Sequence, residues 1–331
     1  MQEKKVGAAA KTKNPYGIES PSHFAGKVPM KELLGGVLKP MLGMGTWLLS
    51  QDKTEQVVYR AVKDFGYRMI DTAKMYQNEE QIGKALKRLF SEGVVKREEI
   101  FITSKLWLDG RGRVEQELKE SLKRLQLDYL DSFIMHFMVP NVNKDTLAVE
   151  RNSLQDVWRD MEKCFKQGLT RSIGVSNCST VMLMDLLSFC EIKPCSNQIE
   201  IHPYLVQHDV HELHHELGIP LEAYSPLNPQ QDPFPNEKVK DLVLMNDQVL
   251  KGLSQKYGKS VAQIVLNWHV KYMRHIVFPR MTQDSHMKEN MEIFGFEMSE
   301  DDYKKVSCMN KNARFYDKVP VQEFAWIPIT A

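Results

Sequence analysis

Hydrophobic and polar positions alternate in a regular rhythm from about residue 28 almost to the end of the chain. Short apolar runs, typical of buried strands, are followed by longer stretches with one apolar face, typical of amphipathic helices. In the stretch 114–125 this face repeats at Val114, Leu118, Leu122 and Leu125, while lysine and glutamate fill the others. The pattern predicts strands at residues 41–46, 67–71, 100–105, 129–136, 172–176, 196–200, 221–223 and 275–278, and helices at 54–64, 79–90, 114–125, 153–166, 180–188 and 261–271.

This alternation of strands and helices predicts the fold. It favours a parallel sheet, and eight strand–helix units are the number in a (β/α)8 TIM barrel. Two further apolar runs, 30–34 and 37–41, flank Gly35-Gly36, which favours a β-hairpin that caps the bottom of the barrel. Residues 1–27 lack a hydrophobic period and are expected to form a flexible N-terminal tail, which leaves 28–331 as a single domain.

A doubly wound Rossmann domain with an attached module is the alternative fold. Gly43 and Gly45 begin like a dinucleotide-binding fingerprint. However, Leu48 stands where the third glycine is needed for close packing of helix against strand. The partial motif therefore gives the Rossmann fold little support.

Composition narrows the range of functions. The 331 residues carry 44 basic and 43 acidic side chains, a net charge of +1, so the clustered positive charge of a nucleic-acid or membrane-surface binder is not expected. No apolar run reaches about 18 residues, so no membrane span is expected. Five cysteines without a CxxC pair, and no apolar secretory leader, favour a reducing compartment, and we expect a cytoplasmic protein.

Polar and titratable side chains gather where the expected strands end. In a TIM barrel the carboxyl ends of the strands form the mouth at which the chemistry takes place. Tyr76 follows Asp71 by five residues and falls in the same strand–helix loop. The residues at the strand ends are Thr46, Trp47, Asp71, Lys105, His136, Ser176, Asn177, Gln198, Tyr224, Ser225 and Arg280.

Four of these side chains could together supply a proton to a carbonyl group. A tyrosine is a poor acid at neutral pH, but a neighbouring lysine ammonium favours the phenolate and lowers the tyrosine pKa. A carboxylate keeps the lysine charged and oriented, and a histidine can polarise the carbonyl by hydrogen bonding. Asp71, Tyr76, Lys105 and His136 provide this set, which suits a carbonyl that receives a hydride from elsewhere.

Six stretches carry a resemblance to a known family: GYRMIDTAKMYQNEEQIG (66–83), FITSKLW (101–107), LDYLDSFIMH (127–136), SIGVSN (172–177), NQIEIHPYL (197–205) and AYSPL (223–227). Over about residues 28–315 the chain resembles the aldo-keto reductases, and most of all their aldose and xylose reductase branch. The resemblance implies a (β/α)8 barrel that uses NADPH, with NADH as a secondary cofactor, and no Rossmann fold. It also implies that Tyr76 is the general acid, that Lys105 lowers its pKa, that Asp71 pairs with Lys105 and that His136 orients the substrate.

The same resemblance implies a cofactor site and a substrate pocket. Ser176, Asn177 and Gln198 correspond to the groups that hold the nicotinamide carboxamide. Tyr224 corresponds to the ring that stacks on nicotinamide. The expected cofactor contacts are Thr46, Trp47, Asp71, Ser176, Asn177, Gln198, Tyr224, Ser225 and Leu227 (the last two along the pyrophosphate), Arg280, Thr282 and His286 (at the 2′-phosphate), and Glu289 and Asn290 (at the adenine); the expected substrate contacts are Trp47, Trp107, His136 and Phe137.

Some positions depart from the family pattern. Arg280-Met281 stands where the family usually has Lys-Ser, and His286 replaces a frequent arginine. Phe137 replaces a tryptophan that commonly follows the histidine, as in xylose-reductase-like members. Tyr316 falls where that branch commonly carries a substrate-binding asparagine, so sugar specificity does not simply transfer.

We therefore expect NADPH-dependent reduction of aldehydes, including aldoses, to alcohols, with Tyr76 as the acid. The C-terminal segment, with Phe324 and Trp326, is expected to form a substrate loop over the mouth. A non-catalytic scaffold that binds nucleotide on the same fold is the alternative, and the complete set of four residues favours the enzyme. The expected partner is a small-molecule carbonyl substrate, and neither nucleic acid nor a membrane.

One further motif points to a different chemistry. His211-Glu212-Leu213-His214-His215 matches HExxH, the pattern of zinc hydrolases. Such a site also needs a third ligand and a cleft, whereas this segment falls on an outer helix, away from the expected mouth. We expect a surface helix and no metal.

Overall fold

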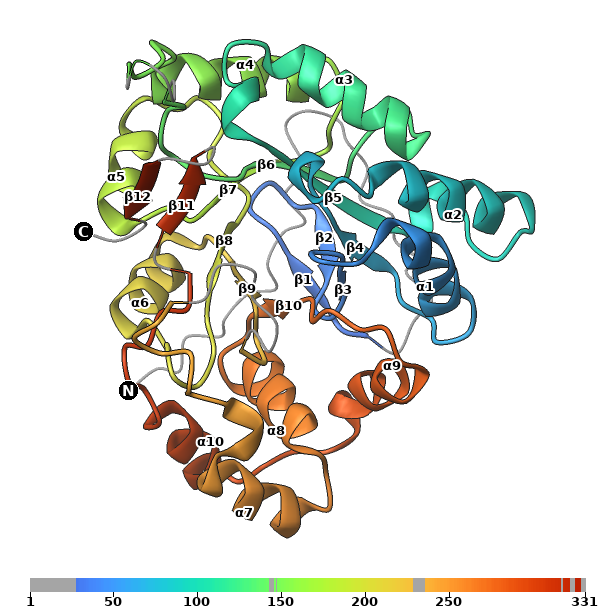
Figure 1. The fold of residues 1–331 in the computed structure, drawn as a ribbon, viewed down its shortest axis with the longest axis vertical. Coiled ribbons are helices and arrows are strands. Elements are labelled where there is room, and N and C mark those ends of the chain that lie inside the picture. Colours follow the sequence, from blue (N-terminus) through green and yellow to red (C-terminus); the bar gives the residue numbers. More distant parts are fainter. Residues whose placement is uncertain are drawn as a thin grey trace, which may run out of the picture.

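The computed structural model describes residues 28–142, 146, 148–228, 236–316, 318–321 and 325–328, so the expected tail at 1–27 lies outside the described residues. Eight parallel strands form one sheet in which neighbours follow chain order (Figure 1). The strands are β3 (Met44–Gly45), β4 (Met69–Asp71), β5 (Phe101–Leu106), β6 (Ser132–Met135), β7 (Ile173–Ser176), β8 (Asn197–Glu200), β9 (Leu221–Tyr224) and β10 (Ile276–Val277).

The first and last strands meet and close the sheet into a barrel. The backbone N–H of Gly43 donates to the Val277 oxygen at 2.8 Å, and that of Gly45 donates to the Pro279 oxygen at 3.2 Å. A side chain at Gly45 would collide with the carbonyl oxygen of Phe278, so glycine permits this close approach. The Gly-Met-Gly stretch therefore serves barrel closure. The expected (β/α)8 barrel is confirmed, and the Rossmann alternative is wrong.

Helices cover the outside of the barrel (Figure 1). Three of these helices begin at serine N-caps, Ser153, Ser179 and Ser260. Each side-chain oxygen accepts a hydrogen bond from a backbone N–H group in the first turn. The helices are α1 (Gln51–Lys63), α2 (Glu79–Ser91), α3 (Val114–Leu125), α4 (Leu154–Lys166), α5 (Thr180–Phe189), α6 (His208–Leu217), α7 (Gln248–Tyr257), α8 (Val261–Asn267), α9 (Asp284–Met291) and α10 (Glu300–Ser307), with a π-helical turn at Trp268–Tyr272 and 3₁₀ turns at Lys74–Tyr76, Arg97–Glu99, Leu108–Gly110, Leu244–Asn246 and Glu292–Gly295.

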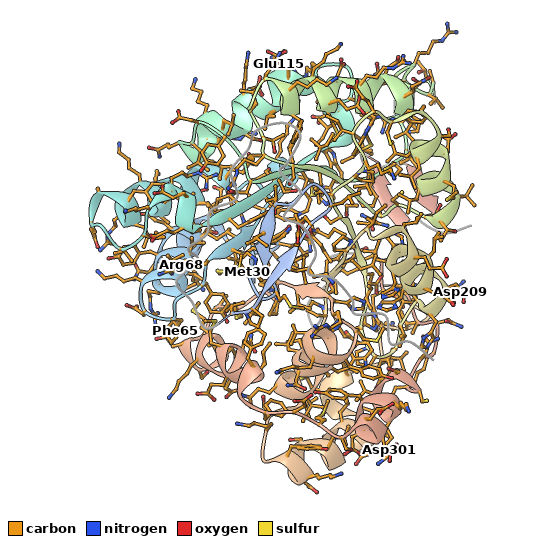
Figure 2. The ribbon with its side chains drawn as sticks, turned by 180° about the vertical axis from the view of Figure 1, so that it is seen from behind. Met30, Phe65, Arg68, Glu115, Asp209 and Asp301 are labelled. Carbon is orange, nitrogen blue, oxygen red and sulfur yellow. The ribbon has the colours of Figure 1, made fainter. Side chains whose placement is uncertain are left out.

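A β-hairpin closes the bottom of the barrel, as expected. Strands β1 (Met30–Glu32) and β2 (Leu38–Pro40) pair antiparallel, and Gly35 and Gly36 turn the chain at φ 98° and 85°, a region that favours glycine. The N–H of Leu34 donates at 3.3 Å to the oxygen of Cys195, just ahead of β8, so the hairpin meets the amino ends of the strands. Figure 2 shows the hairpin, with Met30 labelled, across this end of the barrel.

The C-terminal segment contains a second hairpin, β11 (Lys318–Val321) paired antiparallel with β12 (Ala325–Pro328). Phe324 and the side chain of Trp326, which were expected to cover the mouth, lie outside what the structure describes. Among the described residues, no helix has the length and apolar character that crossing a bilayer requires.

Two histidines are buried against each other between the π-helical turn and β10. The Nδ1 atoms of His269 and His275 lie 3.1 Å apart, and both side chains are sequestered from solvent. Burial lowers the pKa of His269 to about 3 and the pKa of His275 well below its usual range. Both rings are therefore neutral in the folded protein at neutral pH.

Acid should weaken the fold through these histidines. An unfolded histidine takes up a proton near pH 6.5, whereas folded His269 does so only at about pH 3. Stability therefore falls as pH falls through this window, by about 1.4 kcal/mol per pH unit for each such histidine. We expect His269→Gln to flatten the dependence of the free energy of unfolding on pH between about 6.5 and 4.5, measured by urea denaturation.

His215→Gln, at an exposed position of α6, is the control and should leave the slope unchanged. A wild-type slope in His269→Gln would contradict the prediction.

Candidate active site

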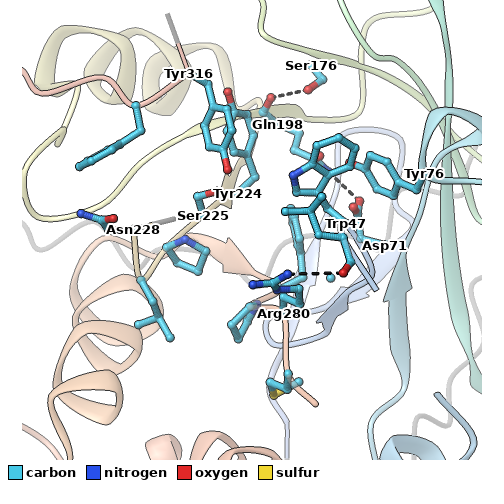
Figure 3. A pocket seen from close by; sticks show the side chains of 18 of the residues that line it. Trp47, Asp71, Tyr76, Ser176, Gln198, Tyr224, Ser225, Asn228, Arg280 and Tyr316 are labelled. Atoms are coloured by element: carbon cyan, nitrogen blue, oxygen red, sulfur yellow. Dashed lines mark hydrogen bonds between the residues drawn. The ribbon is translucent and has the colours of Figure 1, made fainter. Parts of the chain in front are cut away.

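A cavity of about 810 Å³ opens at the carboxyl ends of the barrel strands (Figure 3). Because parallel strands end at the same edge, residues far apart in the chain meet here. Most of the expected site residues line it: Trp47, Asp71, Tyr76, Trp107, His136, Phe137, Ser176, Asn177, Gln198, Tyr224, Ser225, Leu227, Arg280, His286, Glu289 and Asn290.

Three expected site residues do not line this cavity. Lys105 lies in β5 with its side chain fully buried behind the wall. Thr46 is buried as well, and its hydroxyl donates to the carbonyl oxygen of Asp71 at 2.9 Å. Thr282 is exposed. The structure therefore brings neither Thr46 nor Thr282 into the cavity.

The ammonium of Lys105 organises one end of the cavity. Its Nζ donates to Asp71 Oδ1 at 2.5 Å, to the Thr72 carbonyl oxygen at 2.9 Å and to the Tyr76 hydroxyl at 3.1 Å. Adjacent strands β4 and β5 supply Asp71 and Lys105, and the 3₁₀ turn after β4 supplies Tyr76. All three N–H groups of the ammonium are thus used, and one of them fixes the phenol at the cavity wall.

Burial decides how these groups titrate. It raises the pKa of Tyr76 well above its usual range, and the negative charge of Asp71 adds to this shift. Burial also lowers the pKa of Lys105, although Asp71 opposes the change. The sequence predicted a lowered pKa for Tyr76, and the shift is in the opposite direction. Asp71 offsets the charge of Lys105, and the desolvation of a buried phenolate then raises the pKa. Tyr76 therefore holds its proton at neutral pH.

His136 follows β6 and lies among aromatic rings. Its ring centroid is 4.9 Å from that of Trp107, 5.2 Å from that of Phe137 and 5.8 Å from that of Tyr76. Burial, with a contribution from the Lys105 charge, lowers the pKa of His136 well below its usual range. Its Nδ1 is buried and has no hydrogen-bond partner in the described part of the chain. The imidazole is therefore neutral, with a polar atom left unpaired.

A second group of polar side chains comes from the ends of β7, β8 and β9. Asn177, at a φ of 53°, donates from Nδ2 to the His136 carbonyl oxygen at 3.0 Å, and its Oδ1 accepts from the Tyr224 hydroxyl at 2.8 Å. The Ser176 hydroxyl donates to the Gln198 carbonyl oxygen at 2.7 Å (Figure 3). These bonds hold the amide of Asn177 and the ring of Tyr224 in place before any ligand binds.

The outer part of the cavity follows β10 and includes α9. Arg280 is exposed and its Nη1 lies 3.5 Å from the Leu48 carbonyl oxygen, while His286 is exposed on α9. Met281 is buried, and its sulfur accepts from Asn290 Nδ2 at 2.9 Å. Arg280 thus supplies a positive charge at the rim, and Met281 supplies no hydrogen bond there.

The donor set suits a nicotinamide dinucleotide phosphate. The amides of Asn177 and Gln198 can bind a carboxamide, and the ring of Tyr224 offers a flat surface to an aromatic ring. Arg280 offers a guanidinium to a phosphate. The residues present therefore fit the cofactor that the sequence resemblance implies.

Sequence reasoning missed Glu200, the last residue of β8. Its carboxylate is fully buried and accepts from the backbone N–H groups of Phe315 at 2.8 Å and Tyr316 at 3.1 Å. This places Tyr316 against Tyr224, with ring centroids 5.7 Å apart, in the cavity wall. The Glu200 carboxylate oxygen Oε1 also lies 3.0 Å from His202 Nε2, but no spacing rule marks the contact with the C-terminal segment, because those backbone groups are more than a hundred positions away.

The HExxH motif belongs to α6, on the outside of the barrel (Figure 1). His211 Nε2 lies 3.1 Å from the Met273 carbonyl oxygen, and His215 is exposed. Over the described ranges, no group of three or more histidine, cysteine or acidic side chains could hold a metal ion.

Comparison with known proteins assigns this barrel to a family. Residues 41–311 match the aldo/keto reductase family, and the chain belongs to that family.

Relatives of this chain include enzymes named for different substrates. The chain is 37% identical to the NADH-dependent D-xylose reductase of Candida parapsilosis, over 91% of this chain and 97% of that protein. It is 35% identical to the NADP-dependent D-sorbitol-6-phosphate dehydrogenase of Malus domestica, over 85% of this chain and 94% of that one. A crystal structure of an aldo-keto reductase from Bombyx mori in complex with NADP superposes with a TM-score of 0.77 at 34% identity, covering 87% of this chain and 94% of the other.

Glu200 should control how firmly the segment at Tyr316 is held. The Glu200 carboxylate accepts two charge-assisted hydrogen bonds from backbone N–H groups, and each bond of this kind contributes about 1.5–3 kcal/mol to stability. We expect Glu200→Ala to speed hydrogen exchange at the amides of Phe315 and Tyr316 by about 10- to 150-fold. Glu216→Ala, at an exposed position of α6, is the control. Unchanged exchange at both amides in Glu200→Ala would refute this role.

Proposed function

We propose that this protein reduces aldehydes, aldoses among them, to alcohols with NADPH, and uses NADH as a secondary cofactor. The observation that carries the proposal is the Tyr76 hydroxyl at the cavity wall, protonated and 3.1 Å from a buried ammonium. A scaffold that only binds nucleotide would have no use for a proton donor assembled in this way.

Tyr76 acts as the general acid. When bound, the cofactor supplies a hydride to the carbonyl carbon, and negative charge then develops on the carbonyl oxygen. The Tyr76 hydroxyl donates its proton to that oxygen, and the ammonium of Lys105 stabilises the phenolate that is left. Asp71 holds Lys105 in place and balances its charge before the reaction.

His136 orients and polarises the carbonyl. Because its imidazole is neutral, it can donate a hydrogen bond to the substrate oxygen without competing with Tyr76 for the proton. Its packing against Trp107 and Phe137 fixes the ring plane. A neutral donor at this position stabilises developing negative charge and does not attract anionic substrates in advance.

The remaining roles are those that the family resemblance implies, and the position of these residues in the cavity wall supports them. Ser176, Asn177 and Gln198 hold the nicotinamide carboxamide, and Tyr224 stacks on the ring. Arg280 and His286 meet the 2′-phosphate. The further cofactor contacts are Trp47, Asp71, Ser225, Leu227, Glu289 and Asn290, all of which line the cavity.

The aromatic walls around the acid define the substrate class. Trp47 lies 4.9 Å from the ring of Tyr76, and Trp107 and Phe137 form a second wall beside His136. Aromatic faces suit apolar chains and the C–H faces of sugars better than anionic groups. Aldehydes with an apolar or hydroxylated tail are therefore the preferred substrates.

A reducing compartment such as the cytoplasm suits this protein. Its five cysteines are all free thiols, and Cys164, Cys178 and Cys195 are buried. Burial raises the pKa of the Cys178 thiol to about 12, which keeps it unreactive.

Removal of the acid should stop turnover without preventing cofactor binding. General acid catalysis is typically worth about 10²–10⁴ in rate, so we expect Tyr76→Phe to lower kcat for glyceraldehyde reduction by about that factor. The NADPH dissociation constant, measured by fluorescence quenching, should change little. Tyr316→Phe, which removes another hydroxyl from the same cavity, is the matched control. If Tyr76→Phe keeps most of its activity, the proposed role of Tyr76 is wrong.

Cofactor preference should depend on Arg280. The 2′-phosphate of NADPH carries about −1.5 to −2 charges at neutral pH, and an exposed guanidinium at the rim can bind it bidentately. We expect Arg280→Ala to weaken NADPH binding about 10-fold and leave NADH binding nearly unchanged. Calorimetric titration measures both, and Lys288→Ala on α9 is the control. Equal losses for both cofactors would show that Arg280 does not recognise the phosphate.

A further inference from the structure

A charged pair lies in the barrel interior beneath the candidate active site. Lys39 belongs to β2 of the bottom hairpin, and Glu222 belongs to β9 of the barrel wall. Both side chains are 0% exposed. Lys39 Nζ lies 2.7 and 2.8 Å from the two carboxylate oxygens of Glu222, and it also donates to Thr103 Oγ1 at 3.2 Å.

The pair connects to the site through one amide group. The side-chain nitrogen of Gln198 lies 3.2 Å from Glu222 Oε2 and 2.8 Å from Asp71 Oδ2 (Figure 3 shows the bond to Asp71). Glu222 Oε1 also accepts from the Ser196 hydroxyl at 2.6 Å. A continuous set of buried contacts therefore runs from Lys39 to Asp71, and from Asp71 to Lys105.

This arrangement decides which way the Gln198 amide faces. An ionised carboxylate can only accept hydrogen bonds, and Gln198 has two N–H groups to donate. Two carboxylates beside the same nitrogen therefore use both N–H groups and exclude the amide oxygen from that side. The oxygen is left to serve as an acceptor in the cavity that Gln198 lines.

Lys39 is the part of the chain that keeps Glu222 ionised. A buried carboxylate without a cation takes up a proton, and a protonated carboxyl can donate to an amide oxygen. Only Asp71 would then still require the Gln198 nitrogen on that side, and one of the two contacts that hold the amide in this orientation would be lost. Because a buried ion pair adds little net stability over apolar residues of similar size, stability alone gives no reason for charges here.

We propose that Lys39 and Glu222 are positioning residues that fix the Gln198 amide with its oxygen toward the cofactor carboxamide. This inference rests on the proposed function, because it assumes that a nicotinamide binds in the cavity. It predicts that the site distinguishes the carboxamide, which has N–H donors, from an acetyl group, which has none.

Two double variants test the proposal without leaving a buried charge unpaired. Lys39→Met with Glu222→Leu removes one of the two acceptors beside the Gln198 nitrogen and leaves Asp71, whereas Lys39→Met with Glu222→Gln keeps an acceptor oxygen at position 222 and is the conservative rescue. The readout is the ratio of dissociation constants for NADPH and its 3-acetylpyridine analogue, measured by fluorescence without turnover. Thermal unfolding of each free protein shows that it is folded.

We expect the wild-type preference for NADPH over the analogue to fall about 2- to 10-fold in the Leu variant, as for loss of one oriented hydrogen bond, and to recover in the Gln variant. A reduced preference in both variants also supports the positioning role of the Lys39–Glu222 pair, and it shows that the charge of the pair is required. A wild-type ratio in the Leu variant overturns the proposal.

Asp131→Asn is the matched control. Asp131 is another buried carboxylate in the barrel wall, paired with Arg97 at 2.8 Å and Arg171 at 3.1 Å. Its loss should lower the unfolding temperature and leave the cofactor ratio unchanged. The test is separate from that of the proposed function, because Tyr76→Phe tests catalysis whereas the two double variants test cofactor binding.

Discussion

The site depends on one contact, the ion pair between Lys105 and Asp71 inside the barrel. A buried ammonium has lost its hydration, and this loss is offset only when each N–H group finds an acceptor. Asp71, the Thr72 carbonyl and the Tyr76 hydroxyl are those three acceptors. The contact that allows the lysine to be buried therefore also fixes the phenol, and the adjacency of β4 and β5 makes the contact possible.

Most of the fold could be predicted, because each amphipathic segment carries its own boundaries. The helix Val114–Leu125 matches its predicted range, since its apolar face begins and ends with the helix. Strand β3 is shorter than predicted because Leu42 pairs with β10 only through an isolated bridge at the closure. The helix predicted at 261–271 changes to a π-helical turn at Trp268–Tyr272, where His269 packs against His275. No local pattern marks that change, since its cause lies in tertiary packing.

The candidate site, like the fold, contains residues that could be predicted from the sequence and residues that could not. Residues at strand ends, such as His136 and Gln198, could be placed from the sequence because the topology brings every strand end to one mouth. Lys39 and Glu222 could not, since a lysine in a short hairpin resembles any exposed lysine and its partner is 183 positions away. Glu200 was missed for a related reason: its partners in the C-terminal segment are backbone groups, which leave no signal in the sequence.

The pKa of Tyr76 shows where reasoning from residue pairs is incomplete. Beside a lone lysine its pKa would fall, but Asp71 offsets the charge of Lys105, and burial then raises the Tyr76 pKa. Tyr76 and His136 are consequently both neutral in a cavity walled by aromatic rings. In the proposed reaction, Tyr76 keeps its proton until negative charge develops on a substrate oxygen next to it. Only then does transfer from the phenol become favourable, because the phenolate left behind faces an ammonium already oriented toward it.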